Sequence, residues 1–169
     1  MSFGKSYSPN RAYVSEAIAY AAEKGVLLVH AAGNSAENID VADNFPNDKF
    51  GDNSNNWSNW IEVGASSWGA EDEFIGNFSN YGRKSVDLFA PGVAIYSTAP
   101  DNNYQDAQGT SMASPVVAGV AALLLSHFPE LSADQLKDVI DQMGLLVSKV
   151  HSAGIIHGDL TTSNMIMTN

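Results

Sequence analysis

The chain contains no cysteine, which excludes disulfide bonds, thiolate metal sites and a cysteine nucleophile. Positive charge is also scarce, because eight Lys and Arg residues stand against 19 Asp and Glu residues and leave a net charge of −11. Such an acidic balance argues against nucleic acid and anionic membranes as partners. The sequence has no uninterrupted run of 18 apolar residues, so no membrane span is predicted.

What the chain does contain is an alternation of helical and extended patterns over a length of 169 residues, which suggests one domain. A helical pattern opens at Ser8 and Pro9 and closes at Gly25, and the apolar, β-branched strand pattern 26–34 follows it. Short strands are predicted at 60–66, 86–92 and 94–98, and the polar stretch 37–59 is predicted to be a long surface loop. We therefore expect an α/β fold with a largely parallel sheet flanked by helices.

Two further helices are predicted in the second half of the chain. The first begins near Ser111 and is apolar on nearly every side, so we expect it to be buried at the centre of the domain. The second begins with a capping box at Ser132, is amphipathic, and is expected to stop at Gly144.

The segment 109–115, with the sequence GTSMASP, carries the clearest chemical signal. Ser111 follows a glycine turn and opens a helix, so its hydroxyl and backbone N–H lie at the positive end of the helix dipole. A developing oxyanion is stabilised at such a position. A serine before a helix is commonly a simple cap, but the full heptapeptide favours a nucleophile. The pattern G-x-S-x-A also differs from the G-x-S-x-G elbow of α/β-hydrolases.

Two other segments belong with this motif. The strand 26–34 ends in Gly33 and Asn34, which taken alone is also ordinary turn chemistry. The chain begins with Ser2-Phe3-Gly4. Together with GTSMASP, these segments resemble the subtilisin-like serine peptidases, or subtilases.

The resemblance implies a role for each segment. Ser111 would be the nucleophile and the Asn34 amide the second donor to the oxyanion. Ser2, Phe3 and Gly4 would form an extended strand that pairs with a bound peptide or protein substrate and forms one wall of a specificity pocket. The remaining substrate-binding positions implied are Ala32 and Gly33. The resemblance also implies an extracellular or periplasmic location.

No cofactor is expected, although many subtilases bind Ca²⁺. The polar stretch contains four carboxylates whose spacing matches no defined calcium loop, so solvated turns are the preferred interpretation. These residues are Asp40, Asp43, Asp48 and Asp52.

A serine nucleophile needs a base and a carboxylate that orients it, and subtilases carry them in the order Asp, His, Ser. In the family the Asp lies in an Asp-x-Gly type motif at a strand end and the His in a His-Gly-Thr-His type helix start. Neither motif occurs in this chain. His30 is expected to be a packed strand residue, and His127 follows Ser111 by 16 residues of helix, roughly 24 Å. His151 and His157 belong to another segment. We therefore expect residues 1–144 to be a partial catalytic domain, truncated at the N-terminus and inactive alone, with a missing segment supplying both residues.

The segment 155–165 differs from the rest and resembles the catalytic loop of the small atypical kinase of the KEOPS complex. In that family Asp159 would accept a proton from the substrate hydroxyl and Asn164 would hold Mg²⁺. No phosphate-binding loop or further metal ligand accompanies them. Residues 145–169 are thus expected to be a tail rather than a domain, either poorly protected or packed over a bare sheet edge. A kinase fragment and a non-catalytic peptide-binding remnant remain the alternatives to a peptidase.

Overall fold

The structure is a computed structural model, and it describes residues 1–5, 8–50, 55–68 and 74–152. Its centre is a parallel sheet in the order β1-β4-β5, formed by Leu28–Ala31, Trp60–Ser66 and Leu88–Pro91. All seven residues of β4 are buried, as expected for the middle strand of a parallel sheet covered on both faces. The predicted α/β class with a parallel sheet is confirmed.

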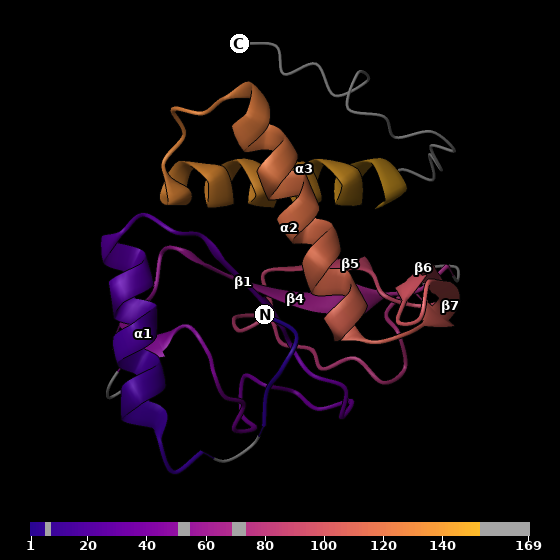
Figure 1. Cartoon of the computed structure of the whole chain (residues 1–169), viewed down its shortest axis with the longest axis horizontal. Coiled ribbons are helices and arrows are strands. Elements are labelled where there is room, and N and C mark those ends of the chain that lie inside the picture. Colours follow the sequence, from indigo (N-terminus) through magenta and orange to yellow (C-terminus); the bar gives the residue numbers. More distant parts are fainter. Residues whose placement is uncertain (6–7, 51–54, 69–73, 153–169) are drawn as a thin grey trace.

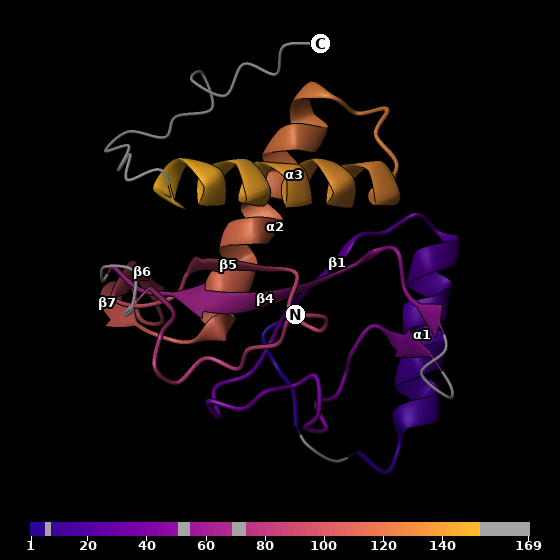
Figure 2. The same cartoon turned by 180° about the vertical axis from the view of Figure 1, so that it is seen from behind.

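Helix α2, Thr110–His127, packs across all three strands of the sheet, and helix α3, Ala133–Ser152, packs on α2 (Figure 1). Helix α1, Arg11–Glu23, stands to one side of the sheet and runs downward from its level, whereas α3 lies above the sheet in both views (Figures 1 and 2). The main core fills the space between the sheet and helices α2 and α3. It consists of Val29, Ile61, Val63, Ala65, Ala90, Ala113, Val117, Ala121, Leu136 and Ile140.

Helix α2 is less buried than its composition predicts. Small residues such as Ala113 and Ala121 face the sheet, but Val116 is 37% exposed and Leu123 is 45% exposed. The expectation of burial on every side is wrong because the three strands and α3 cover only part of the helix surface. Within the described part of the chain, α2 is also the helix with the length and mean hydropathy, 1.4, that would suffice to cross a membrane. Its packing against the sheet is that of a core helix.

Helix α3 does not stop at Gly144 but continues to Ser152, so the predicted helix end is wrong. The apolar positions Leu136, Ile140 and Met143 are followed by Val147 and Val150, and this spacing of four and three residues keeps one stripe turned inward. One glycine inside a helix costs only about 1 kcal/mol, which a continuous apolar stripe outweighs. The division of the chain at residue 144 therefore does not coincide with the end of a helix.

The polar stretch 37–59 is more ordered than a surface loop. Ile39 and Phe45 are buried, and β2, Lys49–Phe50, pairs with β3, Asn55–Asn56. The predicted strand at 94–98 is β6, Ile95–Ala99, and it pairs with β7, Asn103–Ala107, which the sequence pattern did not indicate. β7 is almost wholly exposed, so it lacks the apolar alternation by which strands are recognised.

The first residues of the chain lie along the free edge of β1. The amino group of Met1 donates to the carbonyl of Val29, and the Ala31 N–H donates to the Met1 carbonyl at 3.0 Å. Lys5 pairs with Phe45 through two backbone hydrogen bonds of 2.9 and 3.0 Å. Residues 2–4 are therefore held between two backbone anchors.

Candidate active site

Ser111 lies in the first turn of α2, whose N-cap is Gly109. As one of the first N–H groups of a helix, the Ser111 N–H has no acceptor within the helix and carries the positive end of its dipole. The Ser111 hydroxyl donates to the carbonyl of Ser2 at 3.4 Å, and the Ser2 hydroxyl donates to the carbonyl of Ser111 at 3.0 Å. Ser111 therefore makes no side-chain cap, and its hydroxyl lies beside the N-terminal segment.

Asn34 comes just after β1, on an exposed turn. Its Oδ1 accepts hydrogen bonds from the backbone N–H of Thr110 at 2.9 Å and from the Thr110 hydroxyl at 3.0 Å. The Thr110 hydroxyl in turn accepts from the N–H of Gly33 at 3.1 Å. Thr110 binds the oxygen of the Asn34 amide. The amide nitrogen therefore points away from Thr110 and can donate to another group.

The geometry at Gly109 shows how close the two predicted oxyanion donors are. A Cβ atom at this position would lie 3.3 Å from Asn34 Nδ2 and 3.7 Å from the backbone nitrogen of Ser111. The two nitrogens therefore border the same small space. Gly109 also has a φ of 145°, a backbone conformation that favours glycine, so both the space and the backbone require a residue without a side chain.

A groove of about 370 Å³ connects these groups. The predicted residues that line it are Ser2, Phe3, Gly4, Gly33, Asn34 and Ser111. Ala32 is fully buried and does not line the groove, since its backbone N–H and carbonyl bond to Val63 and to the amides of Asn44 and Asn80. A role for Ala32 in substrate binding stays a prediction.

His30 and His127 do not bond to Ser111. His30 is fully buried, as expected for a packed strand residue, and its two ring nitrogens contact Glu62 and the carbonyl of Phe3. His127 is the last residue of α2, at the end of the helix opposite Ser111. Asp159, Asn164 and His157 lie outside the described residues.

Asn80 supports the turn that carries Asn34. Its Oδ1 accepts from the backbone N–H groups of Ser35 and Glu37, each at 3.0 Å, and its Nδ2 donates to the carbonyl of Ala32 at 2.8 Å. The side chain is 4% exposed. Asn80 belongs to the segment FSNYG, whose residues resemble those of subtilases and are expected to position loops and carry no chemistry themselves.

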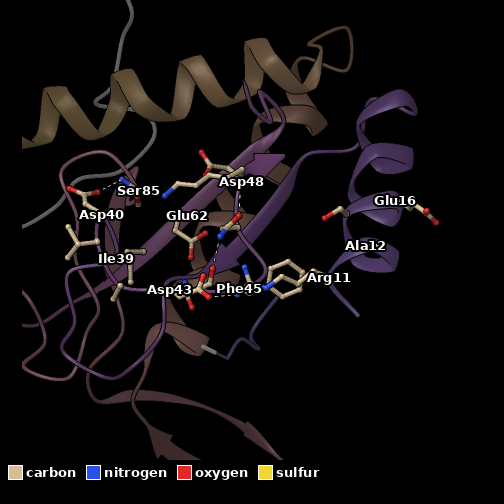
Figure 3. A pocket seen from close by; sticks show the side chains of 16 residues that line it. Arg11, Ala12, Glu16, Ile39, Asp40, Asp43, Phe45, Asp48, Glu62 and Ser85 are labelled. Atoms are coloured by element: carbon tan, nitrogen blue, oxygen red, sulfur yellow. Dashed lines mark hydrogen bonds and ion pairs between the residues drawn. The ribbon is translucent and has the colours of Figure 1, made fainter. Parts of the chain in front are cut away.

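A larger cavity, about 740 Å³, lies between α1 and the segment 39–49 and contains none of the predicted site residues (Figure 3). Its charged lining includes Arg11, Asp40, Asp43 and Asp48, and Arg11 forms an ion pair with Asp43. Burial and the nearby carboxylates raise the pKa of Asp48. The groove at Ser111 is smaller than this cavity, but it contains Ser111 and Asn34.

Asp40, one of the four carboxylates of the polar stretch, is engaged by backbone N–H groups. Both oxygens of Asp40 accept hydrogen bonds from backbone N–H groups, those of Arg83, Lys84 and Ser85, at 2.8 to 3.0 Å. In the described part of the chain no three acidic or histidine side chains are grouped as metal ligands. Asp52 lies outside that part.

The hydrogen bonds to Asp40 lead us to expect that the stability of the protein depends on pH. Burial alone would raise its pKa, but the backbone N–H groups of Lys84, Arg83 and Ser85 together lower it below its ordinary 3.8. A carboxyl group with a lowered pKa stabilises the fold above its unfolded-state pKa, and this stability is lost as the pH falls through the folded-state pKa. Thermal unfolding measured between pH 6 and about pH 3 should show a steeper loss for the wild type than for Asp40→Asn. Parallel pH curves would contradict this assignment.

A half-buried serine at a helix N-terminus, with an amide donor beside it and a groove at the end of parallel strands, is an arrangement that serine hydrolases use. Residues 1–144 match the model of the Subtilase family, and the chain belongs to that family.

Individual relatives agree with the family assignment. The chain is 38% identical to Subtilisin DY of Bacillus licheniformis over 126 residues, which are 74% of this chain and 42% of the relative. A solved structure of a cold adapted subtilisin-like serine proteinase superposes with a TM-score of 0.66 at 32% identity, covering 83% of this chain and 45% of that one. For the S41 psychrophilic protease the TM-score is 0.70 at 30% identity, with 84% and 47% covered. The chain thus spans less than half the length of these proteins.

Proposed function

We propose that this chain carries the nucleophile and the oxyanion donors of a serine endopeptidase, with Ser111 as the nucleophile and Asn34 as the side-chain donor. Ser2, Phe3 and Gly4 line the path of the substrate peptide, and the family relationship favours an extracellular or periplasmic setting. The one observation that carries the proposal is the fixed Asn34 amide. Thr110 binds its oxygen twice, so its nitrogen borders the same space as the Ser111 backbone nitrogen.

This pair of donors suits an acyl-transfer step. When the Ser111 hydroxyl attacks a peptide carbonyl, negative charge develops on the carbonyl oxygen, and donors held in place beforehand stabilise it without reorganising. Removal of one such donor costs on the order of a hundredfold to a thousandfold in turnover, a magnitude measured in subtilisin itself.

The attack also needs a base, and the described histidines do not supply one. Both ring nitrogens of His30 are engaged by Glu62 and Phe3, and His127 lies at the far end of α2. We propose that the base and its orienting carboxylate come from a segment outside this chain. The chain alone then binds peptide but does not cleave it at a measurable rate.

The test combines a cleavage assay with a binding assay on the 169-residue chain. Hydrolysis of a chromogenic peptide should be the same for the wild type and Ser111→Ala, within the assay background. Peptide binding, followed by NMR with a blocked tetra-alanine amide, should shift signals of residues lining the groove. Cleavage that disappears in Ser111→Ala would show that the chain contains its own base. A peptide that leaves the groove signals unchanged would contradict the peptide site.

The tail motif offers a kinase as a second candidate, with Asp159 as the proton acceptor and Asn164 as the magnesium ligand. Both residues lie outside the described part of the chain, and no observation on the described residues favours phosphoryl transfer. The non-catalytic peptide-binding remnant differs from our proposal only in whether Ser111 reacts once a base is present.

A further inference from the structure

The sheet contains a buried polar cluster on the strands next to the groove. His30 of β1 lies opposite Glu62 of β4 in the parallel register, and their side chains are 0% and 5% exposed. His30 Nδ1 and Glu62 Oε1 are 2.8 Å apart, and the indole N–H of Trp60 donates to Glu62 Oε2 at 2.7 Å. The rings of His30 and Trp60 are 5.0 Å apart between centroids. The imidazole is thus fixed from two sides.

The other nitrogen of the imidazole reaches the N-terminal segment. His30 Nε2 lies 2.6 Å from the carbonyl oxygen of Phe3, and because a carbonyl only accepts, Nε2 is the donor. The Phe3 ring stands edge-on to the imidazole, 6.3 Å away between centroids. Yet the Phe3 side chain is 62% exposed, so burial of this residue contributes little to holding the segment. The hydrogen bond to His30 therefore holds Phe3 against the interior of the protein.

This anchor sets the orientation of the segment. Successive carbonyl groups of an extended chain point in opposite directions. The Phe3 carbonyl points inward to His30, while the Ser2 carbonyl lies 3.4 Å from the Ser111 hydroxyl, on the groove side. By this alternation, the Gly4 carbonyl is expected to point the same way as the Ser2 carbonyl. Fixing Phe3 therefore directs the neighbouring main-chain groups toward a peptide that pairs along the segment.

We propose that His30 is a positioning residue for substrate binding, which holds the Ser2–Gly4 segment in register through the Phe3 carbonyl and is itself oriented by Glu62. The inference rests on the proposed function, since it assigns Ser2–Gly4 to the substrate path. His30 makes no contact with the reacting atoms. Its effect is on peptide affinity, and it acts through the segment that it holds.

The test must separate this role from a contribution to stability, because removing one partner of a buried pair leaves the other unpaired and destabilises the fold. The double variant His30→Leu/Glu62→Gln avoids that problem. It removes both ionisable groups at similar volume, and the amide oxygen at position 62 still accepts from the Trp60 indole. His30→Gln/Glu62→Gln keeps a side-chain N–H near the Phe3 carbonyl, differs from the first double variant only at position 30, and serves as the rescue variant. Val63→Ala, on the opposite face of β4, is the matched core control.

Two readouts are measured on the full chain of each variant: the affinity for the blocked tetra-alanine amide, and the NMR signal and order of the Gly4 amide, which shares a peptide group with the Phe3 carbonyl. We expect the double variant to lose about tenfold in affinity and to show a shifted, more mobile Gly4 amide, with its melting temperature retained. His30→Gln/Glu62→Gln should remain within about threefold of the wild type. Val63→Ala should lower the melting temperature and leave affinity and Gly4 unchanged.

The outcomes distinguish this inference from the proposed function. If the wild type binds the peptide and the double variant binds equally well, the positioning role is overturned while the peptide site stands. If the wild type binds no peptide, the proposed function fails, and the Gly4 readout still decides whether His30 holds the segment. An unchanged Gly4 amide in the double variant overturns the inference in either case.

Discussion

Replacement of Asn80 by Ala is expected to lower the free energy of unfolding by about 2 to 3 kcal/mol. The substitution removes the acceptor of the Ser35 and Glu37 N–H groups and one of the two amide donors to the buried carbonyl of Ala32, which keeps its hydrogen bond from Asn44. Each hydrogen bond contributes about 1 kcal/mol, and a polar group left unsatisfied raises the cost of its loss. Because Asn34 lies inside this turn, its amide is also expected to lose its fixed direction.

Urea unfolding of the two proteins measures the first effect, and the NMR signals of the Ser35 and Glu37 amides report the second. Asn47→Ala is the matched control, because Asn47 also accepts from one backbone N–H and donates to one carbonyl, but within its own half-buried turn. Its cost is expected to stay below about 1 kcal/mol. Equal costs for the two substitutions would show that Asn80 is an ordinary loop residue.

Replacement of Gly64 by Ala is expected to cost about 1 to 3 kcal/mol for a different reason, overpacking. A Cβ atom at Gly64 would lie 2.3 and 2.4 Å from two carbons of the Phe89 ring, its register partner on β5. These distances are far shorter than any normal contact, so the ring or the strands must move. The middle strand of the sheet is packed on both faces and offers little room for that movement.

Gly144→Ala is the opposite case and provides the control. Apart from the adjacent residues and the nearby backbone of α3 itself, no atom lies within 4 Å of a Cβ at this position, and the residue lies inside α3. Because Ala favours a helix over Gly by about 1 kcal/mol, this substitution should raise the melting temperature. Thermal unfolding of both variants gives the comparison. A stabilised Gly64→Ala would contradict the sheet packing, and a destabilised Gly144→Ala would contradict the continuous helix.

The end of α3 shows how a local signal can mislead. Glycine is common just after the end of a helix, so Gly144 indicates a helix end. The apolar stripe of α3 continues to Val147 and Val150, and this spacing indicates a longer helix. The information was present in the spacing of the apolar residues, but it competes with the glycine, and the packing of α3 on α2 decides between them. The polar strand β7 is a harder case, since its exposed residues carry no periodic pattern and the strand exists through its pairing with β6.

The sequence by itself determined the class of the fold and the elements that carry Ser111 and Asn34, because hydrophobic periodicity and glycine turns act over a few residues and leave a local record. Only the tertiary structure decided which groups meet. Ser2 lies beside Ser111 across 109 positions of the chain, and His30 meets Glu62 and the Phe3 carbonyl. Such contacts depend on strand register and on how the helices pack, which no local pattern encodes.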